Sequence, residues 1–188
     1  TNSFEVDAQH RGYSVDCLYY SPANNSWLNF HNAKKDIDNK IIRLINNPHD
    51  SILEAKIRLI SGPILVGQLG DGWKLDEATH NAIKDYHLKI VMAHSAQIYT
   101  EMYKLLTEVA IPSRVFNILR STKLLEPLFP ELLLGIGLAQ SNKGTEGLDL
   151  YKHIMFALDS VSTKQANCLL IRLGALLHDI AKPHTQVE

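Results

Sequence analysis

Three polar residues near the amino end have side chains of the kinds that bind a phosphate or a metal ion: Arg11, Ser14 and Asp16. They lie in or beside the segment 13–19, in which apolar and polar residues largely alternate, as in a strand with one buried face. A guanidinium, a hydroxyl and a carboxylate around one strand could line such a site. An edge strand with a solvated polar face accounts for the same residues, and the pattern by itself favours this second interpretation.

The residues around this segment predict a small β element at the amino end. We expect one or two strands between residues 1 and 20. A further short strand over 27–30 would form a hairpin across the turn residues Asn24, Asn25 and Ser26.

From Asp50 onward the apolar residues recur at helical spacing. Ser51 and Glu54 predict a capping box at the start of a helix that breaks or kinks at Gly62-Pro63. Asp76 is the expected N-cap of the next helix. The helices predicted after the break cover 77–86, 95–109, 114–120, 148–161 and 165–181, with 135–147 as a linker. The predicted fold class is therefore mainly α, a small β element followed by a bundle of roughly six to eight helices.

The composition is that of an ordinary globular chain, with 188 residues of which 45% are hydrophobic. A net charge of −1 argues against a nucleic-acid-binding surface over the whole chain, although a local basic patch is compatible with it. Cys17 and Cys168 stand in apolar surroundings, which predicts two buried thiols in a reducing compartment. Without a recognisable signal peptide or membrane-spanning run, we expect a cytoplasmic protein. Because the chain begins at Thr1 and enters a predicted strand almost at once, we interpret it as a fragment of a longer protein.

The stretch 10–20 resembles the Arg-Arg-Asp-Phe-Thr-Ile-Asn-Ala-Leu-Tyr-Tyr signature of the tRNA nucleotidyltransferase and poly(A) polymerase family. Arg11 and the final Leu-Tyr-Tyr match it outright, whereas Gly12 stands in place of Asp and Asp16 in place of Asn. The segment 124–130, Leu-Leu-Glu-Pro-Leu-Phe-Pro, resembles bacterial poly(A) polymerases more than CCA-adding enzymes.

This resemblance implies three parts: the end of a nucleotidyltransferase head over 1–47, a helical neck and RNA-binding body over 48–140, and a helical segment over 141–188. A full-length member of the family extends RNA 3′ ends from ATP with Mg²⁺ as cofactor, so the implied partners are an RNA 3′ end and ATP. The family's Gly-Ser motif and its two catalytic carboxylates would lie upstream of Thr1. We therefore expect no catalytic residue in this chain, and we do not expect it to polymerise alone.

In the family, a Glu-Asp-x-x-Arg run on the neck helix pairs with the edge of the incoming base. Here the run is 54–58, Glu-Ala-Lys-Ile-Arg, in which Arg58 keeps the donor fork and Ala55 has no acceptor. On one helix, positions 55 and 58 would share a face. The resemblance thus implies an eroded nucleotide site, for which the candidate binding residues are Arg11, Asp16, Glu54 and Arg58. A helix-capping Glu54 and a solvated Arg58 are the alternative.

The segment 176–183, Leu-Leu-His-Asp-Ile-Ala-Lys-Pro, resembles the His-Asp signature of the metal-dependent phosphohydrolases. His153 stands where that superfamily has its first histidine, so the resemblance implies a divalent metal site of His153, His178 and Asp179. Two histidines that only pack between helices are the alternative.

Three functions follow from these patterns. The first is a poly(A) polymerase-like RNA nucleotidyltransferase, and the second is a metal-dependent phosphohydrolase. The third is a non-catalytic relative that binds RNA or takes part in an assembly.

Overall fold

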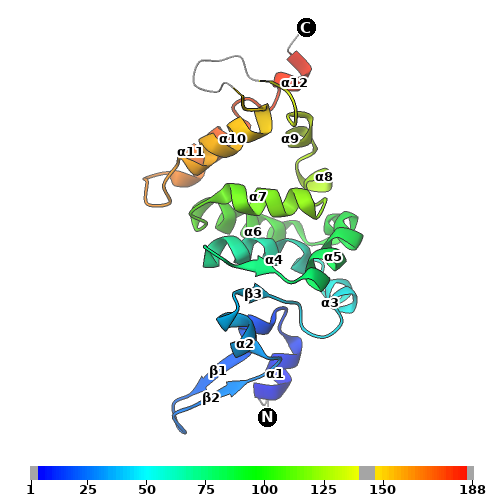
Figure 1. Cartoon of the computed structure of the whole chain (residues 1–188), viewed down its shortest axis with the longest axis vertical. Helices are drawn as coiled ribbons and strands as arrows, with labels where there is room; N and C mark the ends of the chain where they lie inside the picture. The colour runs from blue at the N-terminus through cyan, green and yellow to red at the C-terminus, as the bar shows by residue number, and fades with distance from the viewer. Residues whose placement is uncertain (1–3, 140–146, 186–188) are drawn as a thin grey trace.

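The computed structural model describes residues 4–139 and 147–185 and shows a mainly α protein with a small β element, which confirms the predicted fold class. In Figure 1 the chain runs from its amino end at the bottom to its carboxyl end at the top, so that successive elements form successive tiers. The first α-helices are α1 Phe4–His10, α2 Ala33–Asp38, α3 Pro48–Glu54, α4 Arg58–Leu69, α5 Glu77–Tyr86 and α6 Ser95–Thr107. The later ones are α7 Pro112–Ser121, α8 Leu125–Leu128, α9 Pro130–Leu134, α10 Leu150–Asp159, α11 Cys168–Leu177 and α12 Lys182–Thr185.

The strands form two small pairs, and two short 3-10 helices complete the list. The strands are β1 Leu18–Ser21, β2 Ser26–Asn29, β3 Ile41–Ile42 and β4 Lys74–Leu75, and the 3-10 helices are η1 Ser14–Cys17 and η2 His87–Met92. Strands β1 and β2 pair in antiparallel fashion, which confirms the predicted hairpin, and the rings of Tyr20 and Trp27 lie 5.1 Å apart across it. Strands β3 and β4 pair in parallel over two residues each. They connect the segment before α3 to the turn between α4 and α5.

The predicted strand over 13–19 is wrong in its first half, and so is the expectation of strands before it. Residues 4–10 form helix α1, residues 14–17 form η1, and the strand begins only at Leu18. The cause is burial of polar groups that the alternation pattern treats as solvated. The hydroxyl of Ser14 is fully buried and donates to a carboxylate oxygen of Asp36 at 2.6 Å, and Arg43 Nε donates to the same oxygen at 3.0 Å.

The predicted helix with a capping box at Ser51 and Glu54 is also wrong. Helix α3 begins earlier, where the side chain of Asn47 accepts from the backbone of His49, and it ends at Glu54. Ala55 is extended, with φ −141° and ψ 101°, and α4 begins at Arg58. Ala55 and Arg58 therefore do not share a helix face.

Of the predicted break or kink at Gly62-Pro63, the break is absent, because α4 continues through Pro63 to Leu69. A proline inside a helix removes one backbone hydrogen bond. Leu59, Ile60 and Ile64, which flank it, have no exposed surface, and their burial favours the continuous helix.

The later helices agree with the sequence more closely. Asp76 caps α5 as predicted, accepting from the backbone of Thr79 at 3.2 Å. Helices α6, α7 and α10 lie in the predicted segments, although the two helices at 148–161 and 165–181 are shorter than expected. Residues 140–146 of the predicted linker lie outside the described residues.

One large hydrophobic core runs from Tyr13 to Leu176 and includes side chains from every tier. A smaller core of Ala8, Cys17, Ala33 and Ile45 lies at the amino end. Cys17 is buried as expected, whereas Cys168 is only half-buried. Among the described residues, no helix is long and apolar enough to cross a membrane. The division of the chain into three parts stays a prediction.

Candidate functional site

The signature segment, residues 10–20, contacts helix α4 at Tyr13. Its buried hydroxyl donates to the backbone carbonyl of Arg58 at 2.5 Å and lies 3.4 Å from Ser61 Oγ. The ring also fills the space beside Gly62, where a Cβ atom would lie 2.5 Å from Tyr13 Oη. Burial raises the pKa of the Tyr13 phenol far above its usual value, so it remains a neutral donor. This contact joins the amino-terminal part to α4.

Arg58 is the most constrained of the predicted nucleotide-binding residues. Its Nη1 donates to the carbonyl and the hydroxyl of Ser51 at 2.9 and 3.1 Å and to the Glu54 carboxylate at 2.6 Å. Its Nη2 donates to the carbonyls of His10 and Arg11 at 3.2 and 3.4 Å. In this conformation the donor fork is occupied by the chain itself and connects α1, α3 and α4.

Of the other three predicted nucleotide-binding residues, only Asp16 lines a cavity together with Arg58. Arg11 is exposed and pairs with Asp7 at 2.8 Å rather than with a group of the neck. The hydrogen bond from Arg58 holds the pKa of Glu54 below its usual value. Glu54 lies outside the cavity between the signature segment, α4 and α6, the seam cavity. Asp16 lines that cavity, and partial desolvation raises the pKa of its carboxyl.

The seam cavity lies between the signature segment, α4 and α6 and has a volume of about 290 Å³. Its lining is mostly polar and consists of Gly12, Tyr13, Asp16, Arg58, Ser61, Leu65, Gln68, Glu101 and Lys104. The structure thus brings Asp16 and Arg58 to one cavity. A Cβ at Gly12 would lie 3.1 Å from Arg58 Nε, so the Asp of the family signature would here stand beside the guanidinium.

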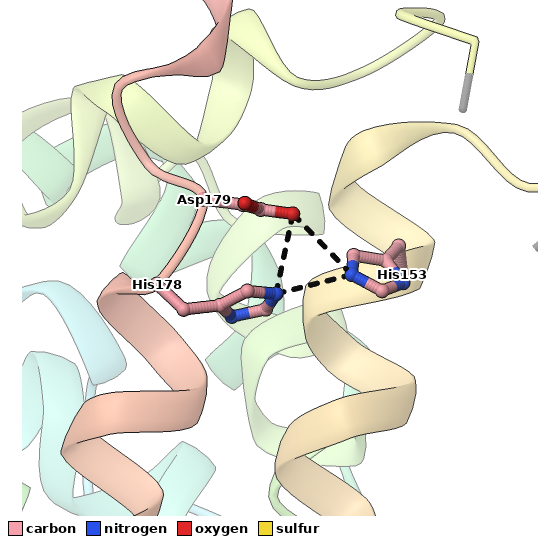
Figure 2. A group of neighbouring side chains, drawn as sticks. All are labelled: His153, His178 and Asp179. Carbon is pink, nitrogen blue, oxygen red and sulfur yellow. Dashed lines mark hydrogen bonds and ion pairs between the residues drawn. The ribbon is translucent and has the colours of Figure 1, made fainter. Parts of the chain in front are cut away.

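The three predicted metal ligands meet at the carboxyl end of the chain (Figure 2). His153 projects from α10, His178 follows the last residue of α11, and Asp179 comes next in the chain. The Nε2 atoms of His153 and His178 are 3.1 Å apart. Asp179 Oδ2 lies 3.4 Å from His153 Nε2 and 3.2 Å from His178 Nε2. A tetrahedral metal with bonds of about 2.0–2.1 Å places its ligand atoms about 3.3 Å apart, so this donor set fits such an ion.

Hydrogen bonds around the cluster orient these ligand atoms. His178 Nδ1 lies 2.8 Å from the carbonyl of Ala175, which assigns the proton to Nδ1 and leaves the Nε2 lone pair facing the cluster. Asp179 also accepts from Lys182 at 2.6 Å. Burial raises the pKa of Asp179, but Lys182 and the two histidines more than offset this, so its pKa lies below the usual value.

A second cavity was not indicated by the sequence. It has a volume of about 760 Å³ and lies between the turn after α4, the start of α5 and α7. Trp73 and Arg114 are among the residues that line it. The nearest signal in the sequence is the pair Gly70 and Gly72 before Trp73, which predicts a turn but no cavity.

Comparison with known proteins supports the resemblance. The family model described as "Probable RNA and SrmB-binding site of polymerase A" matches residues 72–134. Poly(A) polymerase I of Escherichia coli O157:H7 is 28% identical over 130 residues, which is 69% of this chain and 27% of that protein. The CCA-adding enzyme of Bacillus subtilis is 27% identical over 128 residues, 68% of this chain and 31% of that enzyme. Over about two thirds of its length the chain is thus similar to poly(A) polymerases and CCA-adding enzymes.

Solved structures of similar proteins share the fold of this chain. A tRNA nucleotidyltransferase complexed with a primer tRNA and an incoming ATP analog matches 94% of this chain and 50% of its own, with a TM-score of 0.70 and 17% identity. The Thermotoga maritima CCA-adding enzyme complexed with tRNA matches 98% of this chain and 45% of its own, with a TM-score of 0.65 and 13% identity. The chain spans about a third or less of the length of the two curated relatives described above.

Proposed function

We propose that this chain contains the end of the head, the neck and part of the body of a poly(A) polymerase-type nucleotidyltransferase, and that it binds the 3′ end of an RNA that the whole protein extends from ATP. The match of residues 72–134 to a family model named for RNA binding carries the proposal. The similarity of 124–130 to bacterial poly(A) polymerases favours ATP addition over CCA addition.

The seam cavity is the proposed place for the nucleotide, with an altered base-reading pair. Asp16 and Arg58 both line it, but Arg58 donates to Ser51, Glu54 and two backbone carbonyls. The side chain of Ala55 supplies no acceptor, and its extended backbone places it outside α4. We infer that any selection of ATP rests on the cavity as a whole rather than on an Asp–Arg pair. Mg²⁺ supplies charge stabilisation for the transferred phosphoryl group in such reactions.

Extension of RNA by the natural protein tests this proposal. Labelled ATP, a short RNA and Mg²⁺ should give products lengthened at the 3′ end, and Lys104→Met at the cavity wall should weaken ATP use. Lys84→Met, which changes a lysine of α5 outside the cavity lining, is the matched control. RNA binding without extension would favour the non-catalytic alternative, and absence of both would contradict the proposal.

A metal-dependent phosphohydrolase is a second candidate, favoured by the cluster of His153, His178 and Asp179. Their ligand atoms all lie within 4.8 Å of one another; one comes from α10 and two come from the residues directly after α11, which packs against α10. A divalent ion bound there would lower the pKa of a coordinated water and so supply a nucleophile for a phosphoester. The residues of this chain would hold the ion, with the Ala175 carbonyl fixing the tautomer of His178.

Thermal unfolding with added Zn²⁺ or Mn²⁺ tests the metal site without an activity assay. A bound ion should raise the midpoint of the wild type, since an ion that binds only the folded state stabilises by about 2.7 kcal/mol at 100 times its Kd. His178→Ala should abolish this shift, and His184→Ala in α12 should retain it. Equal shifts in all three proteins would remove this candidate.

A further inference from the structure

The large cavity beside Trp73, the Trp73 cavity, is lined by both apolar and charged side chains. Ile41, Val66 and Ile118 supply aliphatic walls, and the indole of Trp73 supplies an aromatic one. Lys74 and Arg114 add positive charge, and Asp76 and Glu77 add negative charge where α5 begins. Such a site suits a flat ligand with apolar faces and polar edges.

We propose that the Trp73 cavity binds one base of single-stranded RNA, stacked on the indole, with the adjoining phosphate at Arg114. The inference rests on the proposed RNA-binding function and says where on the body a base is held. Bases of every type stack on aromatic side chains, so this contact would tolerate different sequences.

The size of the cavity agrees with such a ligand. Its volume of about 760 Å³ lies within the range of about 300–1,000 Å³ that is usual for small-molecule sites. It exceeds that of the polar seam cavity, which has about 290 Å³. The cavity therefore has room for a nucleotide together with part of its backbone.

The backbone around Trp73 keeps the indole in place. Gly70 and Gly72 adopt φ values of +85° and +83°, which residues with a side chain rarely adopt. Lys74, which follows Trp73, donates its backbone N–H to the carbonyl of Lys40 at 3.0 Å. This bond is part of the pairing of strand β4 with strand β3. Trp73 itself is half-buried and packs against the main core. A ring held in this way loses little conformational freedom when a base stacks on it.

Arg114 already binds an anion at the edge of this cavity. Its Nη1 pairs with a carboxylate oxygen of Asp71, and the two side chains are 41% and 85% exposed. Exposed pairs of this kind contribute little to stability, so a phosphate can replace the carboxylate at small cost. Asp71 would then act as a competitor of the RNA backbone.

RNA is favoured over a protein partner by the place of the cavity in the sequence. The residues of β4, α5 and α7 that line it all fall within 72–134, the segment matched by the RNA-binding family model. The lining carries two cations, Lys74 and Arg114, beside the carboxylates of Asp76 and Glu77, so it offers contacts to a phosphate as well as to the polar edge of a base. A protein occupant would contradict the inference.

Intrinsic fluorescence provides a direct test, because the chain has two tryptophans. Trp27 lies on the β1–β2 hairpin and is 64% exposed, so Trp27→Phe leaves Trp73 as the single indole at little structural cost. Titration of this variant with a short oligo(A) RNA should quench its fluorescence with the same midpoint as anisotropy of the labelled RNA. An abasic RNA of equal length and charge should bind more weakly and quench little.

Two further variants separate the base from the phosphate. Trp73→Leu should weaken RNA binding about tenfold, because one stacked base is lost. Asp71→Asn should tighten it several-fold, because Arg114 loses its carboxylate competitor. Asp38→Asn is the matched control, since it removes an acid from the exposed pair with Lys34 and should leave RNA binding unchanged. Because Asp71 is exposed, Asp71→Asn should fold and still test the phosphate contact at Arg114, even if Trp73→Leu unfolds the protein.

The results distinguish failure of this inference from failure of the proposed function. RNA that binds without quenching Trp73, with affinity unchanged in Asp71→Asn, would overturn the inference and leave RNA binding in place. Equal quenching by abasic RNA would overturn the stacked base. Quenching by an apolar peptide but not by RNA would indicate a protein partner and overturn it as well. No RNA binding in any variant would overturn both.

Discussion

At the scale of single residues, two buried arginines show that a cation can serve the fold rather than a ligand. Arg58 donates to Ser51, Glu54 and the backbone of His10. Arg172 is fully buried, and its guanidinium donates to the carbonyls of Val161, Val109 and Leu106, together with that of Ala110. It thereby ties α11 to the end of α6 and to the loop after α10.

Replacing Arg172 should therefore destabilise the protein strongly. Arg172→Met removes the donors to several buried carbonyls, each of which costs about 1–3 kcal/mol when left unpaired, so we expect a loss of at least about 3 kcal/mol. Arg120→Met, which removes an exposed guanidinium 5.4 Å from the Tyr151 ring, should cost about 1 kcal/mol. Urea unfolding measures both, and equal losses would contradict the role of Arg172.

The two thiols should differ in reactivity. Burial, with a smaller contribution from Asp16, raises the pKa of Cys17 to about 11, so little thiolate is present at neutral pH. Cys168 is half-buried at the start of α11. A chromogenic disulfide reagent at pH 8 should react quickly with one thiol per native chain and with both after denaturation. Cys168→Ser should remove the fast phase, and a fast phase that persists would contradict this assignment.

At the scale of elements, α4 is the helix on which the middle tier packs. Its Gly67 lets α7 approach closely, because a Cβ there would collide with Val115 Cγ2 and lie 3.0 Å from Val109 Cγ1. Gly62 does the same for the ring of Tyr13 on the amino-terminal side. Small residues at these two positions set the distances between α4 and its neighbours.

Two glycine-to-alanine changes should act in opposite directions. Gly67→Ala should destabilise by about 1–3 kcal/mol, because the added methyl overpacks the contact with Val115. Gly174→Ala in α11 meets no atom within 4 Å, so helix propensity should stabilise the protein by about 0.5–1 kcal/mol. Denaturant midpoints measure both changes, and a neutral or stabilising effect of Gly67→Ala would show that the packing around α4 is looser than described.

At the scale of the whole molecule, charge gives the protein little long-range attraction for RNA. The net charge is −1, and many cations are already paired with acids, among them Arg43 with Asp36 and Asp76. Binding would then depend on local contacts at the cavities rather than on a basic face. The similarity to tRNA-bound structures concerns the arrangement of the helices, which a chain of almost neutral charge can share.

RNA affinity should consequently depend only weakly on salt. If Lys74 and Arg114 are the cations that meet the phosphates, the slope of log K against log salt should be about −1.4, from about −0.7 for each neutralised phosphate of a single strand. Anisotropy titrations from low to moderate salt measure this slope. A slope several times steeper would show that a larger basic surface takes part, and Arg114→Gln should reduce the slope by about half.

The sequence by itself determined the helical class, the β1–β2 hairpin, the cap at Asp76 and the resemblance to the family, because these depend on local patterns and on short motifs. It also named His153, His178 and Asp179 together. Only the tertiary structure decided that residues 14–17 form a 3-10 helix, that α3 and α4 are separate, and that α4 continues through Pro63. The physical reason is burial: Ser14, Arg58 and Arg172 find their partners in segments remote in the chain, and no local pattern reports a partner far away.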